Sequence, residues 1–153
     1  MENLERIIAE CSFFEGLDHA FMNLVGGCAS NVRFDAGSYM FKEGAPADTF
    51  YLLREGKVAL EIFAPHHKPI VIDTLEKGEI VGWSWLLPPY VWKFHAHAVH
   101  NVRAIALDGR CLRTKCEENH DLGYEILKRF VQIIEQRLDA TRLQLLDVYA
   151  VNR

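Results

Sequence analysis

Hydrophobic and polar positions change their period twice along this chain and divide it into three parts. Residues 1–30 have apolar residues at helical spacing. In residues 31–118, apolar and polar residues alternate in short runs that are bounded by Gly, Pro and Asp, a pattern typical of strands and turns. The helical period returns in residues 119–153. The pattern therefore predicts amino-terminal helices, a β-rich unit and a carboxy-terminal helix within one domain.

Two short helices are expected at the amino terminus. Leu4, Ile7 and Ile8 form the apolar face of the first helix, and Gly16 lies in the break that follows it. Asp18 precedes the next apolar stretch and is a suitable N-cap, because its carboxylate can accept a hydrogen bond from the first helical turn.

The strands of the middle part are short and recur at intervals of about 8–12 residues. Turn sequences such as Asp35-Ala36-Gly37 separate them, and the last strand is expected over Ala98–Leu107. This spacing favours an antiparallel closed or two-sheet architecture over a parallel sheet. The predicted fold class is mainly β with flanking α: an antiparallel double-stranded β-helix (jelly roll) with amino-terminal helices and a long carboxy-terminal dimerisation helix.

The carboxy-terminal helix has a seam of residues whose gaps alternate between four and three, which is a heptad pattern. A second apolar row at Ile126, Phe130 and Ile133 widens the stripe in the first half. We predict that this half packs on the β-unit while the seam pairs with a second copy. The alternative is a single helix on its own domain, although 25 residues would extend about 38 Å, more than a small β-roll needs. The seam residues are Leu127, Val131, Ile134, Leu138, Thr141, Leu145 and Val148.

Size and charge narrow the class of protein. The 153 residues are enough for one domain with a hydrophobic core. The 17 Lys and Arg residues against 21 Asp and Glu give a net charge of −4, which argues against a general nucleic-acid-binding surface. No apolar run approaches the roughly 18 residues that would span a membrane, and the amino terminus lacks a signal-peptide layout. We expect a cytoplasmic protein with no membrane partner.

The four cysteines, Cys11, Cys28, Cys111 and Cys116, form no CxxC pair. Reduced structural thiols are therefore expected, as in a reducing compartment.

The most informative segment is Gly78–Ala98, GEIVGWSWLLPPYVWKFHAHA. Two glycines frame its start, a turn-prone stretch follows, and small residues alternate at its end. Five aromatic residues occur within twelve positions. They predict either an aromatic pocket for a flat or apolar ligand, or side chains that pack together as core. These aromatics are Trp83, Trp85, Tyr90, Trp92 and Phe94.

Five short sequence motifs, in the same order as in one protein family, carry a resemblance that extends along almost the whole chain. They are FDAG (34–37), FKEGAPAD (41–48), FYLLREGKV (50–58), KGEIVG (77–82) and VRAIALD (102–108). The chain resembles the cyclic-nucleotide-binding domain superfamily, and within it the sensor domain of catabolite-activator-type bacterial regulators. The resemblance implies a β-roll with flanking helices, a cassette helix inside the roll and a long carboxy-terminal dimer helix.

Such regulators normally continue into a helix-turn-helix domain, whereas this chain ends at Arg153. No DNA-binding domain is therefore expected in this chain. A protein that senses without binding DNA and a truncated regulator are both compatible with this ending.

The resemblance also implies where a cyclic nucleotide would bind. In this family Gly78–Ala98 would be the phosphate cassette, in which a Glu after the second Gly holds the ribose and an Arg holds the phosphate. These positions are Trp83 and Trp92 here, and Tyr90–His97 contains no Arg. Loss of a charge-assisted Arg–phosphate contact removes about 1.5–3 kcal/mol or more. Tight binding of cyclic AMP is therefore not expected.

Family members can use a hydroxyl on the long helix to reach the ligand base, and Thr141 occupies such a place. The alternative is that Thr141 is a polar seam residue without that role. The predicted ligand-binding set of this diverged cassette is Gly78, Glu79, Val81, Gly82, Trp83, Ser84, Trp85, Trp92, His95, His97 and Thr141.

His95-x-His97 places two imidazoles on one face of a strand and is similar to the metal-binding HxH of cupins. A cupin also needs a nearby Glu, which His100-Asn101-Val102-Arg103 does not supply, so no metal ligand is assigned. His97 or Lys93 could instead replace part of the missing positive charge, in which case anion binding would strengthen as the pH falls.

The sequence contains no Ser/His/Asp or Cys/His grouping and no phosphate loop, so no catalytic residue is assigned. The predicted function is a non-enzymatic, homodimeric sensor or regulatory module with a diverged ligand cassette. Three alternatives stay open: binding of a cyclic nucleotide or another small ligand through the altered pocket, a cupin-like metal-binding β-roll, and a purely structural dimer. No cofactor is assigned, and the identity of any small-molecule ligand is left open.

Overall fold

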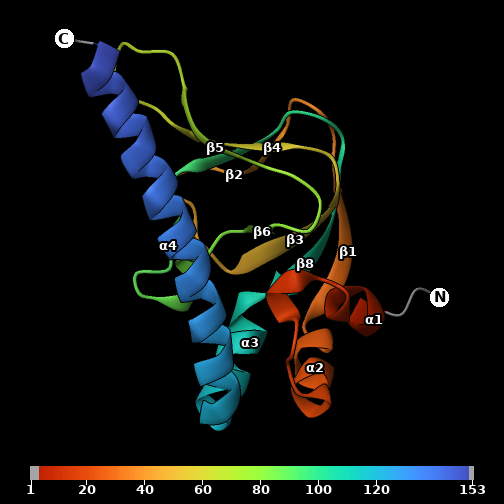
Figure 1. The fold of residues 1–153 in the computed structure, drawn as a ribbon. Coiled ribbons are helices and arrows are strands. Elements are labelled where there is room, and N and C mark those ends of the chain that lie inside the picture. Colours follow the sequence, from red (N-terminus) through yellow and green to blue (C-terminus); the bar gives the residue numbers. More distant parts are fainter. Residues whose placement is uncertain (1–3, 152–153) are drawn as a thin grey trace.

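Two four-stranded antiparallel sheets form the body of the protein, whose computed structural model describes residues 4–151 (Figure 1). The first sheet has the order β1 (Ala29–Phe34), β8 (Val102–Asp108), β3 (Thr49–Glu55) and β6 (Ile80–Val81). The second has the order β2 (Tyr39–Phe41), β7 (His95–Ala98), β4 (Val58–Ile62) and β5 (Ile70–Leu75). The predicted jelly roll is confirmed.

Buried and exposed side chains alternate along strands such as β7, so each sheet has a buried face, and these two faces pack against each other. In β7, Ala96 and Ala98 are fully buried, whereas His95 and His97 are partly exposed on the other face. The upper core lies between the sheets and includes Phe41, Leu60 and Trp92. A separate lower core lies where the first sheet meets the helices, and it includes Ile8, Phe14, Phe50, Trp85, Leu112 and Ile126.

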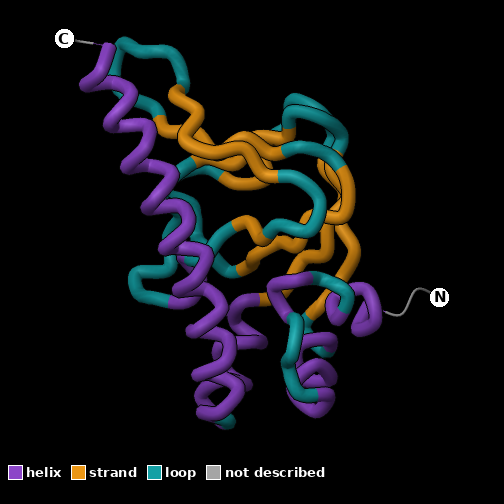
Figure 2. Tube along the Cα trace, in the orientation of Figure 1, coloured by secondary structure: helices purple, strands orange, loops and turns teal. Residues whose placement is uncertain are grey.

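The amino-terminal helices cover one end of the roll (Figure 2). They are α1 (Leu4–Ala9), the 3₁₀ turn η1 (Ser12–Phe14) and α2 (His19–Gly26). The expected N-cap is confirmed, because the Asp18 carboxylate accepts a hydrogen bond from the Ala20 N–H at 3.0 Å. Such a cap contributes about 1 kcal/mol to helix stability.

The carboxy-terminal part consists of α3 (Gly109–Glu118) and α4 (His120–Val151), separated by the extended residue Asn119. The 32 residues of α4 give it a length of about 48 Å, and it runs along the side of the roll (Figure 1). Leu122, Ile126 and Phe130 are buried in the lower core, as predicted for the first half of this helix. Among the described helices, none is both long and apolar enough to cross a membrane.

Two boundaries differ from the sequence-based expectation. The last strand, expected over Ala98–Leu107, is β8 and begins only at Val102, because Ala98 is the end of β7 and the chain must cross to the other sheet between them. The cassette helix is only a 3₁₀ turn, η2 (Ser84–Leu86). Pro88 and Pro89 follow closely, and the missing proline N–H groups prevent a longer helix there.

Candidate functional site

The start of the cassette is fixed to β3 by backbone hydrogen bonds. The Gly78 N–H donates to the Leu53 carbonyl at 2.8 Å, and the Leu53 N–H donates to the Glu79 carbonyl at 3.0 Å. Gly78 has a φ of +88°, a conformation that a residue with a Cβ rarely adopts. The Glu79 carboxylate closes the turn by accepting from the Glu76 N–H at 2.6 Å.

Trp92 fills the space in front of the second cassette glycine. A Cβ added at Gly82 would lie 2.5 Å from the Trp92 ring, so only glycine fits under the indole. The ring also stacks on Phe41, with centroids 3.6 Å apart and planes 9° from parallel. Trp92 is 4% exposed. The position where the family resemblance places a phosphate-binding Arg is thus occupied by a packed aromatic side chain.

Trp85 points the other way, into the lower core. Its ring stacks on Phe50 at 4.7 Å and meets Phe130 of α4 edge-on at 5.5 Å. The Arg113 guanidinium of α3 donates a hydrogen bond to the Trp85 carbonyl and lies over the Tyr90 ring at 4.1 Å. The cassette is therefore in direct contact with both carboxy-terminal helices.

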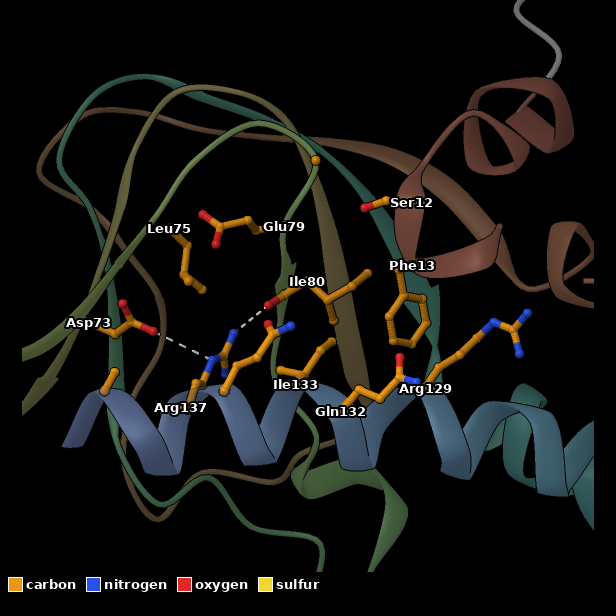
Figure 3. Close-up of a pocket in the computed structure, with 13 residues that line it drawn as sticks. Ser12, Phe13, Asp73, Leu75, Glu79, Ile80, Arg129, Gln132, Ile133 and Arg137 are labelled. Atoms are coloured by element: carbon orange, nitrogen blue, oxygen red, sulfur yellow. Dashed lines mark hydrogen bonds and ion pairs between the residues drawn. The ribbon is translucent and has the colours of Figure 1, made fainter. Parts of the chain in front are cut away.

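Trp83 lies at the edge of the cassette, against the long helix. The Arg137 guanidinium of α4 stacks over the Trp83 ring at 4.6 Å. It also donates a hydrogen bond to the Ile80 carbonyl at 2.6 Å (Figure 3). Its Nε lies 3.6 Å from the Asp73 carboxylate. Burial lowers the pKa of Arg137 to about 10, against the opposing effect of the Asp73 and Glu79 charges, so the group remains positive at neutral pH.

The sequence pattern did not identify Arg137 as part of this region, because a charged residue interrupts the apolar stripe there. A signal was nevertheless present. Arg137 continues the apolar row Ile126, Phe130 and Ile133 at the same four–three spacing, so it faces the roll. The Asp73–Arg137 pair joins β5 to α4 and could not be recognised without the fold, since 64 positions separate the two residues.

The two cassette histidines lie on the outer face of the second sheet, opposite Ala96 and Ala98. His97 stacks on Tyr39 at 4.9 Å, and its Nδ1 lies 3.7 Å from the Glu61 carboxylate. His95 accepts a hydrogen bond from the Glu43 N–H at 3.4 Å. The structure does not bring these imidazoles together with Gly82 and Trp92.

The remaining predicted site residues have local roles. Val81 is buried in the upper core, and Ser84 is partly exposed at the start of η2. The Thr141 hydroxyl donates to the Arg137 carbonyl of its own helix at 2.8 Å and is exposed. Within residues 4–151, no group of three or more His, Cys, Asp or Glu residues is arranged to hold a metal ion.

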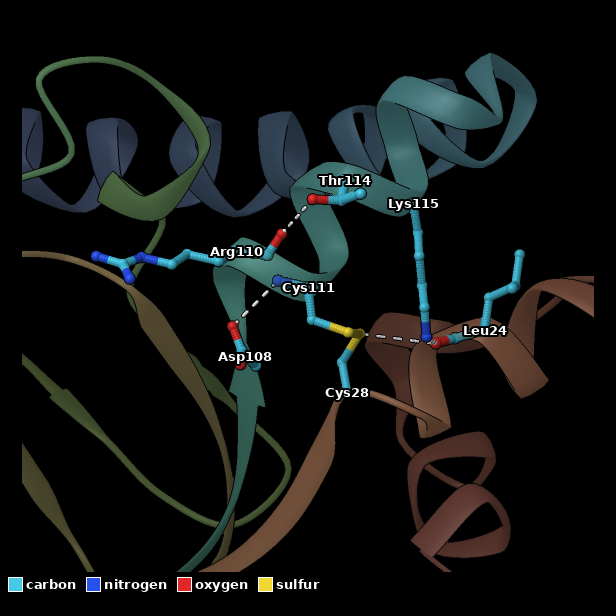
Figure 4. Close-up of a disulfide and its surroundings, with 7 residues drawn as sticks. All are labelled: Leu24, Cys28, Asp108, Arg110, Cys111, Thr114 and Lys115. Atoms are coloured by element: carbon cyan, nitrogen blue, oxygen red, sulfur yellow. Dashed lines mark hydrogen bonds between the residues drawn. A yellow bond between two sulfur atoms is a disulfide. The ribbon is translucent and has the colours of Figure 1, made fainter.

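A disulfide joins the turn between α2 and β1 to α3, which corrects the expectation of four reduced thiols (Figure 4). Cys28 and Cys111 are 83 positions apart, yet the pairing of β1 with β8 brings them together. The Asp108 N–H donates to the Cys28 carbonyl at 2.9 Å, and the Asp108 carboxylate caps α3 at Cys111. Cys11 and Cys116 are free thiols.

The two antiparallel sheets, the flanking helices and the long final helix define the class of domain, a jelly roll flanked by helices. A sequence model of the family described as "Cyclic nucleotide-binding domain" matches residues 31–119. The chain belongs to the cyclic nucleotide-binding domain family.

Among known proteins, the chain is similar to a CRP-like cAMP-activated global transcriptional regulator of Mycobacterium tuberculosis, at 23% identity over 95% of this chain and 63% of the relative. The chain thus spans less than two thirds of that curated relative. A solved structure from Geobacter metallireducens, assigned to the cyclic nucleotide-binding proteins, is 30% identical, with a TM-score of 0.78 over 90% of this chain and 99% of the other. A cyclic nucleotide-binding domain from Methylobacillus flagellatus shares the fold, with a TM-score of 0.79, 16% identity and coverage of 95% and 82%.

Proposed function

We propose that this chain is a non-enzymatic, homodimeric regulatory sensor module whose cassette is closed to cyclic AMP. The observation that supports this most strongly is the packing of Trp92 against Gly82 and Phe41. A nucleotide phosphate at that place would have to displace an indole that is 4% exposed. Displacing a buried aromatic side chain costs several kcal/mol, about the size of its packing contribution.

The charge of the cassette also opposes a cyclic phosphate. An Arg–phosphate pair would contribute about 1.5–3 kcal/mol, which is roughly a 10- to 150-fold change in affinity. Arg137 is the cation beside the cassette, but its guanidinium lies with the Ile80 carbonyl and the Asp73 carboxylate at a cavity that Gly82 and Trp92 do not line. It therefore does not substitute for an Arg at position 92.

The experiment that tests this proposal restores the two family side chains. We expect no thermal stabilisation of the wild type by 1 mM cyclic AMP. The double variant Trp83→Glu/Trp92→Arg should gain binding and be stabilised by about 5–10 °C at saturating ligand. Trp92→Ala is the matched control, because it opens the cavity without adding a cation and should gain little. Stabilisation of the wild type as large as that of the double variant would refute the closed cassette.

Homodimerisation is supported by the exposure of the predicted seam. Leu127, Val131, Ile134 and Leu138 are 48%, 58%, 38% and 48% exposed on the isolated chain. An apolar row of this length on the surface of one chain is typical of a helix that pairs with a second copy.

A cytoplasmic location and the absence of DNA binding by this module are part of the same proposal. The thermal-stabilisation experiment with cyclic AMP described above decides the alternative of an open, nucleotide-binding cassette. The metal-binding alternative predicts near-stoichiometric metal in the purified protein, which elemental analysis would detect.

A further inference from the structure

A cavity of about 460 Å³ lies outside the roll, between α4, the turn η1 and the β5–β6 connection (Figure 3). Its size is within the range of small-molecule sites. Ser12 and Phe13 line one end, and Asp73 and Glu79 line the other. Trp92 and Gly82 are not among the lining residues, so this cavity is distinct from the cassette interior.

The cavity would remain open in a dimer. On α4 it is lined by Gln132, Gln136 and Arg137 among others, whereas the seam includes Val131, Ile134 and Leu138. Gln136 is two positions before Leu138 and therefore lies about 200° round the helix from it. A partner helix on the seam would thus leave the mouth of the cavity exposed.

The charged groups of the cavity favour a ligand that includes a cation. Arg129 also lines it, but its guanidinium is paired with the Glu125 carboxylate at 2.5 Å and donates to the Glu15 carbonyl at 2.8 Å. The remaining charges are the Asp73 and Glu79 carboxylates and the Arg137 guanidinium. This leaves an excess of one negative charge, so a purely anionic ligand would be repelled.

Several polar groups at the cavity also lack protein partners. In the part of the chain that the structure describes, no hydrogen bond is made by the side chains of Ser12, Gln132 or Gln136. The Nη1 atom of Arg137 is buried and has no acceptor. An unpaired buried donor is unfavourable, and a ligand acceptor that draws the guanidinium toward the cavity would recover part of that cost.

We propose that this cavity binds a small zwitterion of the α-amino acid type. The ammonium group would lie between the Asp73 and Glu79 carboxylates, and the carboxylate would accept hydrogen bonds from Arg137 and Gln136. Ile133 and the Phe13 ring provide an apolar wall for the ligand side chain. The mixed charges match a ligand with one group of each sign better than a simple amine or a simple acid.

Binding in this cavity would also affect the position of α4. A ligand held by Asp73 of β5 and by Gln136 and Arg137 of α4 would join the roll to the long helix at the level of Trp83. This consequence rests on the proposed sensor function, whereas binding itself does not. The two can fail separately, since cyclic AMP titration tests the cassette and amino acid titration tests the cavity.

The test is a thermal-shift screen of the full chain with each of the twenty standard L-amino acids at 10 mM. Ethanolamine and acetate serve as probes for the amine and the carboxylate alone. We expect at least one amino acid to raise Tm in a saturable manner, with neither single-group probe doing so. Absence of a shift with every amino acid, or an equal shift with acetate, would overturn the proposal.

Two variants locate the site and one controls for folding. Asp73→Asn keeps the shape of the side chain and the acceptor for the Thr74 N–H. It should lower the affinity for the responding amino acid at least tenfold. Gln136→Leu replaces an exposed amide that has no hydrogen-bond partner, and it should lower the affinity by a similar factor without unfolding the protein. Glu135→Gln, on the exposed surface of α4, should leave affinity unchanged. Unchanged affinity in both cavity variants would place the binding elsewhere and refute the assignment.

Discussion

Trp92 connects the stability of the roll with the closure of its cassette. The indole is held on one side by Phe41 and on the other by the bare backbone of Gly82. Its main chain is fixed as well, because the Trp92 N–H donates to the Ala45 carbonyl at 3.0 Å and its carbonyl accepts from Gly44 at 2.8 Å. The ring is thus part of the core rather than a mobile lid over an open pocket.

The first prediction concerns the energy of that packing. Trp92→Ala should lower the free energy of unfolding by about 3–5 kcal/mol, the usual cost of removing a buried large aromatic side chain. Urea unfolding followed by circular dichroism measures the change. Trp83→Ala is the control, since this partly exposed ring should cost less than half as much. Equal losses in the two variants would mean that Trp92 is not the better packed residue.

The second prediction concerns the cysteines. Because Cys28 and Cys111 are joined, denatured but unreduced protein should react with two equivalents of Ellman's reagent per chain, and reduced protein with four. Native protein should react slowly, because burial raises the pKa of the Cys11 thiol and burial together with Glu117 raises that of Cys116. Four reactive thiols before reduction would contradict the disulfide.

At the scale of secondary-structure elements, α4 has two faces with different partners. Ile126, Phe130 and Arg137 face the protein's own roll, while the seam faces outward. Gln144 extends the contact with the roll by donating to the Ile72 carbonyl at 3.2 Å. The outward face has no partner within the described chain, which is why a second copy is proposed.

The third prediction tests that face. Leu145→Glu, on the seam, should convert a dimer to a monomer of 17.6 kDa, because a carboxylate buried between two helices is strongly unfavourable. Leu143→Glu is a close control, since Leu143 is 64% exposed, Leu145 is 55% exposed, and the two lie on different sides of the helix. Light scattering after size exclusion gives the masses. A wild-type monomer at micromolar concentration, or dissociation by both variants alike, would argue against the seam.

Elements with a strong local period were predictable from the sequence. The Asp18 cap, the short strands and the buried row of α4 all follow from patterns within a few residues. What the sequence did not reveal depends on contacts between distant segments. The Cys28–Cys111 disulfide needs the β1–β8 pairing, and the outward position of His97 needs the strand's register against β4. For the cassette, the substitutions were evident in the sequence, but only the fold distinguishes a filled pocket from an aromatic one.

At the scale of the whole molecule, the cassette and the long helix form one connected unit. Trp85 contacts Phe130 in the lower core, and Trp83 contacts Arg137 beside the upper core. A change at the cassette would therefore affect α4 at two places, as the proposed sensor function requires.

The most direct test of the closed cassette is calorimetric titration of the wild-type chain with cyclic AMP, after denaturation and refolding to remove any bound nucleotide. The filled pocket and the missing Arg predict no saturable heat up to about 1 mM ligand, a free energy of binding weaker than about −4 kcal/mol. Stoichiometric binding with a Kd at or below about 10 µM would contradict the account, because such affinity needs an open cavity and a cation for the phosphate.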